Sequence, residues 1–341
     1  MRFLAIDTSC DETSVAVTDG SKVLSNVISS QIRYHKAYGG VVPMLAARLH
    51  TERIDSVVQL ALKRSKLTPD DIDAIAVTYG PGLAPALQVG ITKAKELAEG
   101  FDVPLYAINH MLGHIASVFA GGEPVFPLLA VVVSGGHSDI ALVRSMADVE
   151  MLGETLDDAL GEAYDKVAKM LGLGYPGGQV VSKLASKGDA SRFHLPIPMM
   201  RGDTPNLSYS GLKNAVRLLI KEQEPLSGVD VQDICAAFEQ AAQASLLRKV
   251  KMALEKHGEV VGVALVGGVA ANTRLRRLMR QLASEYGIPL LLPPKLELCT
   301  DNGAMIGLAA EFLVREGLEP VDLDVIDRAP GLRLDDPMDF R

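Results

Sequence analysis

The feature that most constrains the fold is residues 3–18, where two apolar stretches flank a short polar turn. The first stretch ends at Asp7, and the second runs from Ser14 to Thr18. Both have the composition of β-strands, and the following Asp19-Gly20 pair is typical of a hairpin turn. The polar turn, Thr8 to Glu12, offers hydroxyls, backbone N–H groups and carboxylates, which can hold a phosphate or a cation. The alternative is a solvated hairpin tip.

A second segment has the same organisation. The apolar run from Phe126 to Val133 stops at the small polar sequence Ser134 to Ser138, and Ile140 to Val143 is apolar again. A continuous apolar run is typical of a strand buried on both faces. The two glycines of the turn let a ligand approach the backbone closely. We therefore predict a second strand–turn–strand hairpin with a ligand-binding turn.

A third segment joins an apolar strand, Gly262 to Val266, to a predicted helix, Arg274 to Tyr286, through Gly267-Gly268. A glycine pair between a strand and a helix N-terminus is a usual place for a nucleotide or another anion. Two such hairpins followed by this turn resemble the actin-like ATPase superfamily, which includes hexokinase. The resemblance implies an α/β fold of two related lobes, with the active site in an interlobe cleft.

Two histidines, His110 and His114, lie four residues apart in a segment that Asn109 is suited to begin as a helix N-cap. Their rings are expected on one helix face, at a spacing that suits one divalent metal. Met111 stands where a zincin protease has its glutamate, which excludes that class. Asp301, in a polar turn before an apolar helix, offers a third ligand, a set typical of non-haem iron or catalytic zinc. The alternative is a pair of unrelated surface histidines.

Further motifs follow in a fixed order, and together they resemble one family. The resemblance extends from Met1 to about Val314 and is with the bacterial tRNA N6-adenosine threonylcarbamoyltransferases, long called O-sialoglycoprotein endopeptidases. The motifs that carry it are Ile6 to Thr13, Gly39 to Pro43, Gly80 to Leu83, His110 with His114, Ser134 to His137, Gly161 to Lys166, Tyr175 to Gly178, Ser208 to Lys213, Gly267 to Asn272, and Cys299 to Met305.

This resemblance implies an acyltransferase. The threonylcarbamoyl group would pass from its adenylate to N6 of the adenosine just 3′ of the anticodon, in tRNAs reading codons that begin with A. It also implies one divalent metal per subunit, iron with zinc as the alternative, and ATP or an adenylate as ligand. The implied partners are tRNA, threonylcarbamoyl-adenylate and accessory proteins of the transfer complex, namely a paralogous actin-like subunit and a small P-loop ATPase. The implied location is the cytoplasm, without membrane contact.

The resemblance also assigns residues. His110, His114 and Asp301 would bind the metal, and Asp11 and Glu12 would act beside the phosphate or the metal. The adenylate would be held by Ser134, Gly135, Gly136, His137, Ser138, Asp165, Gly178 and Asn272. A carboxylate such as Asp165 can accept hydrogen bonds from ribose hydroxyls.

Two of these assignments have structural alternatives. Asp165 lies in a predicted helix, Gly161 to Leu171, where it could be a solvated surface residue. Gly177-Gly178 could be a helix stop.

Four positions depart from the family pattern. Met44 and Leu112 stand where the family usually has glutamate, Pro85 replaces a usual glycine, and Ser138 replaces threonine but keeps the hydroxyl. No proposed ligand is lost. The two missing acids affect partner contacts or the electrostatics of the site rather than the reaction class.

The composition agrees with a soluble two-lobe enzyme. No apolar run approaches the roughly 20 residues of a membrane helix, the start has no signal-peptide pattern, and three cysteines in 341 residues suit a reducing compartment. The net charge of −8 argues against a chain that binds nucleic acid over its whole surface. We therefore expect basic partner subunits to share the tRNA contacts.

The predicted organisation is a first lobe of residues 1–119 with a returning helix at about 302–317, a second lobe of residues 120–301, and an irregular tail of residues 318–341. Two other functional classes stay open from the sequence. One is an actin-like kinase of a small metabolite, with Asp11 as base, which leaves the histidine pair unexplained. The other is a non-catalytic nucleotide-binding scaffold.

Overall fold

The computed structural model describes residues 1–336, which form two compact units. Unit 1 comprises Met1–Val125, Arg144–Val149 and the chain from Leu292 onward, and unit 2 comprises Phe126–Val143 and Glu150–Leu291. The lobes predicted from the sequence divide at residue 119 and assign residues 292–301 to the second lobe. Residues 337–341 of the predicted tail lie outside the described residues.

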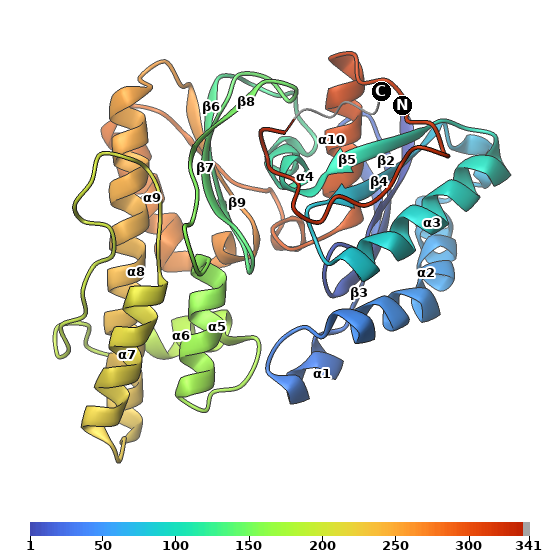
Figure 1. The fold of residues 1–341 in the computed structure, drawn as a ribbon. Helices are drawn as coiled ribbons and strands as arrows, with labels where there is room; N and C mark the ends of the chain where they lie inside the picture. The colour runs from blue at the N-terminus through green and yellow to red at the C-terminus, as the bar shows by residue number, and fades with distance from the viewer. Residues whose placement is uncertain (337–341) are drawn as a thin grey trace. The chain divides into compact units, whose positions relative to one another are not determined.

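Unit 1 contains a five-stranded sheet in the order β3-β2-β1-β4-β5. The first three strands form an antiparallel meander, and β4 and β5 continue the sheet parallel to β1 (Figure 1). The polar turn at residues 8–11 is the connection between the first two strands. The bounds are β1 Arg2–Asp7, β2 Glu12–Asp19, β3 Lys22–Ser30, β4 Ala74–Gly80 and β5 Leu105–Asn109.

Unit 2 contains a second five-stranded sheet in the order β8-β7-β6-β9-β10. Its first two strands are an antiparallel hairpin, and β9 and β10 follow parallel to β6. The two sheets therefore have the same strand order, although the sequence shows no repeat. The bounds are β6 Leu128–Val133, β7 Ser138–Val143, β8 Val149–Gly153, β9 Gly262–Val266 and β10 Leu290–Leu291.

The helices of unit 1 cover both faces of its sheet. On one face α2 and α3 pack together against the strands, and on the other face α10 packs against β1, β2 and α4. The bounds are α1 Ile32–His35, η1 Lys36–Tyr38, α2 Pro43–Ser65, η2 Pro69–Asp71, α3 Ala84–Phe101, α4 His110–Ala116, η3 Ser117–Phe119, η5 Leu296–Leu298 and α10 Gly303–Arg315.

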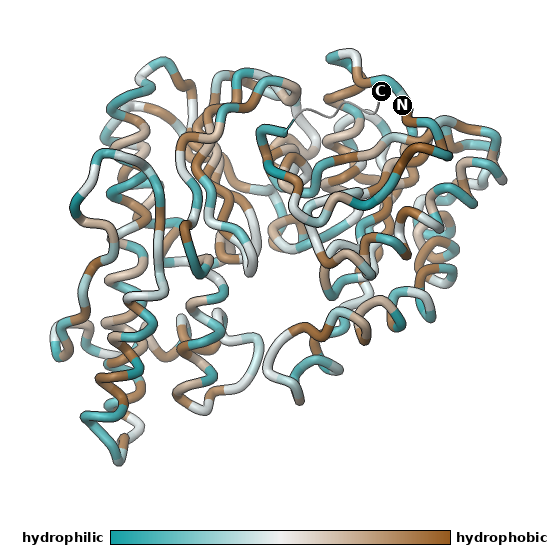
Figure 2. The backbone as a smooth tube through the Cα atoms, in the orientation of Figure 1, coloured by the Kyte–Doolittle hydropathy of each residue, from teal (hydrophilic) through white to brown (hydrophobic). Residues whose placement is uncertain are grey.

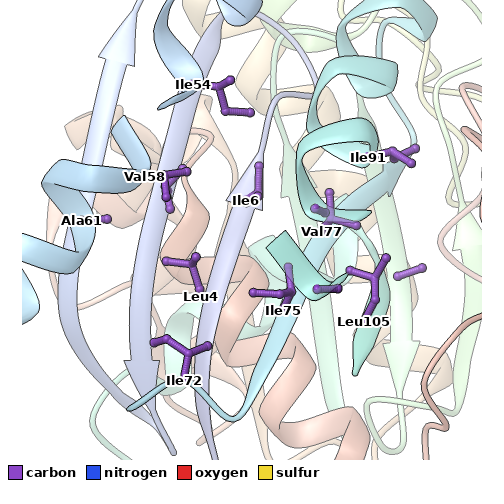
Figure 3. Packing of buried hydrophobic residues seen from close by; sticks show 14 of the residues in the cluster. Leu4, Ile6, Ile54, Val58, Ala61, Ile72, Ile75, Val77, Ile91 and Leu105 are labelled. Atoms are coloured by element: carbon purple, nitrogen blue, oxygen red, sulfur yellow. The ribbon is translucent and has the colours of Figure 1, made fainter. Parts of the chain in front are cut away.

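The alternation of side chains along β1 explains this double covering. Leu4 and Ile6 point toward α2 and α3, beside Ile75 and Val77 of β4 (Figure 3). Successive side chains of a strand point to opposite faces, so Phe3 and Ala5 point to the face that α10 covers. Every residue from Phe3 to Asp7 is buried, which explains the unbroken apolar run before the polar turn.

The helices of unit 2 include a 29-residue helix, α8, whose N-terminus has a capping box between Ser227 and Asp230. In Figure 2 hydrophobic colour follows the strands of both sheets, as expected for sheets covered by helices. The bounds are α5 Leu160–Met170, α6 Gly177–Ala185, α7 Ser210–Gln223, α8 Gly228–Lys256, η4 Gly268–Ala271 and α9 Thr273–Glu285.

Two glycine pairs of unit 2 lie at the start of helical segments. Gly177 is the first residue of α6, so the alternative that the pair at 177–178 stops a helix is wrong. Gly267-Gly268 lies between β9 and the helix predicted from Arg274, with the 3₁₀ turn η4 before Asn272, which caps α9. The described part of the chain has no helix long and apolar enough to cross a membrane.

Gly303 lets α10 approach the first sheet closely, and this contact yields a stability prediction. A Cβ at Gly303 would lie 2.7 Å from the Ala5 carbonyl oxygen and 2.8 Å from the Ala16 nitrogen, both backbone atoms of the sheet. We expect Gly303→Ala to cost about 1–3 kcal/mol of stability, with a fall of about 2–4 °C in Tm per kcal/mol. Thermal unfolding followed by circular dichroism measures this.

Gly100→Ala, in α3, is the matched control, because no atom of the described chain lies within 4 Å of the added methyl group. It should keep or slightly raise the Tm. Equal Tm values for the two variants would contradict the packing argument.

Candidate functional site

The candidate metal ligands come from two helical segments of unit 1: His110 and His114 from α4, and Asp301 from the turn before α10. His110 is the first residue of α4, directly after β5, and Asn109 caps that helix by accepting a hydrogen bond from the Met111 nitrogen at 2.8 Å. Asp301 lies in the turn before α10, which Asn302 caps in the same way at 3.1 Å. The two N-caps, Asn109 and Asn302, therefore fix the backbone conformation next to His110 and Asp301.

The packing of α4 against α10 brings these helix N-termini together. A Cβ at Gly113 would lie 2.9 Å from Ile306 Cδ1 and 3.1 Å from Met305 Cγ, so glycine at this position permits the close approach. Both histidines are buried, His110 with 6% and His114 with 0% of its surface exposed. The alternative of two unrelated surface histidines is therefore wrong.

The three side chains converge on one point. Asp301 Oδ1 lies 3.4 Å from His110 Nε2 and 3.2 Å from His114 Nε2, and one ligand atom from each residue lies within 4.8 Å of the others. Two donors bound to one ion at about 2.0–2.2 Å stand about 3–3.5 Å apart, which fits these distances. Both ring nitrogens of His114 are buried without a hydrogen-bond partner. The residues present thus fit a divalent metal.

The charges of the three groups are strongly coupled. Burial alone would lower the pKa of His110, but the carboxylates of Asp7 and Asp301 outweigh it and raise the pKa to about 10. Burial lowers the pKa of His114, and the adjacent charge of His110 adds to this effect. Burial would raise the pKa of Asp301, but the two histidines hold it well below its usual range. Asp301 is therefore ready to act as an anionic ligand.

Asp7 is a candidate site residue that the sequence analysis missed. Its Oδ1 lies 3.5 Å from His110 Nδ1, the nitrogen opposite the one that faces Asp301, and accepts a hydrogen bond from the Ser9 nitrogen. A carboxylate behind a metal-bound imidazole orients the ring and raises its basicity. The only sequence signal was an acidic residue at the end of a fully buried strand.

Asp11 and Glu12 belong to the same cluster, so the alternative of a solvated hairpin tip is wrong. Asp11 is 7% exposed, and its Oδ2 has no hydrogen-bond partner among the described residues. Glu12 Oε1 accepts a hydrogen bond from the Ser30 hydroxyl. Burial, together with the charges of Asp11 and Asp301, raises the pKa of Glu12 well above its usual range. The turn therefore presents one carboxyl group that favours the protonated form.

In unit 2 the turn between β6 and β7 is held by its own hydrogen bonds. The Ser134 nitrogen donates to the His137 carbonyl at 2.9 Å, and the His137 nitrogen donates to Ser134 Oγ at 3.1 Å. Ser138 Oγ accepts from the Leu160 nitrogen and so ties the turn to α5. Gly135 and Gly136 are exposed, with no described atom within 4 Å of an added Cβ. The tip of the turn has room for an anionic ligand.

Asn272 lies in a buried polar network rather than at a bare surface. Its Nδ2 donates to Glu239 Oε1 at 2.7 Å and to Ser182 Oγ at 3.1 Å, and its Oδ1 accepts from the Leu275 nitrogen at 2.9 Å and from Gln243 Nε2 at 3.3 Å. The side chain therefore holds the N-terminus of α9. Glu239 and Gln243 were missed, because helix periodicity alone gives them no functional signal.

Asp165 lies in α5, and its side chain reaches the start of α6, where Gly178 is the second residue. Asp165 Oδ1 accepts a hydrogen bond from the Gly177 nitrogen at 2.7 Å, so the alternative of a simply solvated helix residue does not hold. Gly178, one residue further, has no described atom within 4 Å of an added Cβ. The structure thus brings the side chain of Asp165 and the backbone of Gly178 together at the N-terminus of α6, where Asp165 accepts from the first N–H group.

The departures from the family pattern fall in different environments. Met44 is 71% exposed in the first turn of α2, whereas Leu112 is 3% exposed between the two histidines of α4. Met44 is therefore available for contacts with other molecules, whereas Leu112 is an apolar core residue of the helix that carries the two candidate ligands.

Comparison with known proteins identifies the family. The model of the TsaD family, described as tRNA N6-adenosine threonylcarbamoyltransferase, matches residues 22–308. The chain belongs to this family. Curated members include a protein of that name from Thermosipho africanus, 44% identical over 98% of this chain and 100% of its own length. Another, from Brucella anthropi, is 46% identical over 97% of this chain and 95% of its own length.

Solved structures of distant relatives share the fold. Full-length HypF in a phosphate- and nucleotide-bound form superposes with a TM-score of 0.63 at 16% identity, covering 93% of this chain and 56% of that chain. The activator of the 2-hydroxyisocaproyl-CoA dehydratase from Clostridium difficile, with bound ADPNP, gives 0.54 at 14% identity, covering 94% and 100%. The expected actin-like α/β fold is thus confirmed.

The three candidate metal ligands can be tested directly in this TsaD-family protein. Asp301→Asn keeps the shape of the side chain but removes its charge, so we expect metal affinity to fall at least about 10–100-fold. Purified protein should then lose its metal in elemental analysis by mass spectrometry.

His257→Ala is the control, because this histidine of unit 2 is paired with Glu259 and lies outside the metal-ligand group. It should retain the wild-type metal content. Equal metal content in Asp301→Asn and wild-type protein would refute the ligand assignment.

Proposed function

We propose that the protein transfers the threonylcarbamoyl group from threonylcarbamoyl-adenylate to N6 of the adenosine 3′ of the anticodon, in tRNAs reading codons that begin with A. The observation that carries this proposal is the 44–46% identity, over nearly the whole chain, to curated proteins named tRNA N6-adenosine threonylcarbamoyltransferase. The His-His-Asp group supports it, because acyl transfer to a poorly basic amine needs an activated carbonyl group.

His110, His114 and Asp301 would hold one divalent ion, iron being our first expectation and zinc the alternative. Such an ion, when bound, supplies Lewis-acid polarisation of a carbonyl oxygen. Asp7 would keep the His110 ring in place from its Nδ1 side, where the two groups lie 3.5 Å apart. The apolar neighbours on α4 limit access of water to the ligands.

Asp11 would accept a proton during the transfer, and Glu12 would donate a hydrogen bond. The Asp11 Oδ2 atom, which has no hydrogen-bond partner in the described chain, is available to accept the proton that the attacking amine loses. Glu12, whose pKa is raised by burial and by Asp11, holds a proton that it can donate in a hydrogen bond. The two acids would thus take different roles.

The adenylate would be bound by residues of unit 2. Backbone N–H groups of the Ser134–Ser138 turn would contact its phosphate, and the N-terminus of α6, with Asp165 and Gly178, would hold the nucleoside. Asn272, fixed by Glu239, would keep the Gly267-Gly268 turn in place before α9. Binding the donor in one orientation aligns its leaving group for attack.

The same proposal covers the partners and the location. tRNA is the acceptor, and an accessory complex with a paralogous actin-like subunit and a small P-loop ATPase would supply the basic surface that this acidic chain lacks. The cytoplasm is the expected location. The metabolite-kinase and scaffold alternatives gain no support from the structure, since neither requires the buried His-His-Asp group.

The reaction predicts a nucleoside phenotype. In a strain depleted of this protein we expect threonylcarbamoyladenosine to disappear from tRNA hydrolysates, measured by mass spectrometry. Wild-type protein should restore it, whereas Asp301→Asn should not. Normal levels of the nucleoside after depletion, in a strain without a paralogue, would refute the proposed function.

The nucleotide-binding turn predicts a selective loss of affinity. Gly136→Val places a branched side chain at the tip of the turn, where open space lets the protein fold but the ligand can no longer approach the backbone. We expect at least a tenfold weaker binding of ATP or AMP by titration calorimetry.

Gly258→Val is the control, because Gly258 is an exposed turn glycine with equally open surroundings. It should bind nucleotide like the wild type. Wild-type affinity in a folded Gly136→Val variant would exclude the turn.

A further inference from the structure

The segment after α10 has no helix or strand between residues 318 and 336, yet it is firmly attached to unit 1. Its side chains Val321, Ile326 and Leu334 are buried. Its backbone bonds to the sheet, because the Val321 nitrogen donates to the Leu105 carbonyl at 2.8 Å and the Ala329 nitrogen to the Tyr79 carbonyl at 2.7 Å. Figure 1 draws this tail in dark red beside β4 and β5.

The later part of the tail, from Ala329, lies at the carboxyl ends of β4 and β5, where helix α4 begins. A Cβ at Gly80 would lie 2.0 Å from the Ala329 carbonyl oxygen, so the two backbones are in direct contact. Next to this contact, the Gly82 nitrogen donates a hydrogen bond to the Pro330 carbonyl at 3.2 Å. We call residues 329–334 the strap.

Asn109 connects the strap to the metal ligands. This fully buried side chain donates from Nδ2 to the Arg333 carbonyl at 2.8 Å, while its Oδ1 accepts from the Met111 nitrogen at 2.8 Å. Asn109 directly precedes His110. One amide group therefore joins a backbone carbonyl of the strap to the first turn of the helix that carries both histidines.

We propose that Asn109 is a positioning residue for the metal ligands and that the strap carbonyl at Arg333 is the partner it needs. The proposal rests on the metal centre of the proposed function. The ring nitrogens of the two histidines lie beside two carboxylates. Asp301 Oδ1 is 3.4 Å from His110 Nε2 and 3.2 Å from His114 Nε2, and Asp7 Oδ1 is 3.5 Å from His110 Nδ1. The position of both rings relative to these carboxylates thus depends on how α4 is held at its N-terminus.

The Asn109→Ser variant separates this role from helix capping. Serine is a good N-cap and can still accept the Met111 hydrogen bond, but it lacks the amide that donates to Arg333. We expect metal affinity to fall about tenfold, as for other residues that support metal ligands. Competition with a chelator, using zinc or cobalt(II) as the probe, measures the dissociation constant, and the cobalt(II) absorption spectrum reports the coordination geometry.

A chain that ends at Leu332 removes the Arg333 carbonyl and leaves Asn109 intact. It should weaken metal binding to the same extent. Combining the truncation with Asn109→Ser should weaken metal binding little further, because both changes remove the same hydrogen bond, from Asn109 Nδ2 to the Arg333 carbonyl. A chain that ends at Asp336 keeps the strap and is the control, with wild-type affinity expected.

The outcomes are distinct. Wild-type affinity and an unchanged cobalt(II) spectrum in folded Asn109→Ser protein would overturn the proposal, and so would fully additive effects of the two changes. Absence of metal binding by the wild-type chain would instead refute the metal centre itself, and the positioning role with it. Thermal unfolding of each variant shows whether it is folded.

Discussion

The burial of β1 on both faces is the constraint from which the rest of unit 1 follows. Alternate side chains of this strand are apolar on each side, so the sheet needs two coverings. Helices α2 and α3 provide one, and α10, almost 300 residues later in the chain, provides the other. Because α10 packs so closely on the sheet at Gly303, its N-terminal turn is placed at the end of β1, and Asp301 comes with it.

The site assembled in this way concentrates charge in a buried place. Asp7 and Asp301 lie beside the buried histidine pair, and Asp7 itself is fully buried, an arrangement that is costly unless opposite charge compensates. In the protein alone, Asp7 and Asp301 raise the pKa of His110 to about 10 despite its burial, so His110 carries the compensating positive charge. A divalent cation would compensate the same carboxylates more completely, and this gives the acidic turn a physical reason to be there.

Because the two sheets have the same strand order, each unit has a polar turn between its first two strands. In unit 1 the turn after the first strand carries acids that suit a cation, and in unit 2 the corresponding turn after β6 carries glycines and hydroxyls that suit an anion. Each turn is held by bonds to a neighbouring element, Asp11 through the Gln31 nitrogen and Ser138 through the Leu160 nitrogen. One topology thus provides two chemically different binding loops.

Local sequence determined much of this protein. The apolar runs before the turns, the cap at Asn109 and the four-residue spacing of the histidines depend on neighbours within one or two turns of chain, so they could be predicted. The polar turn before an apolar helix offered Asp301 as a third ligand, and the family resemblance assigned it that role. Tertiary structure alone decided that Asp7 lies behind His110, that Glu239 holds Asn272, and that an irregular tail bonds to Asn109. These contacts join residues far apart in sequence, and periodicity and capping signals do not reach beyond the element that contains them.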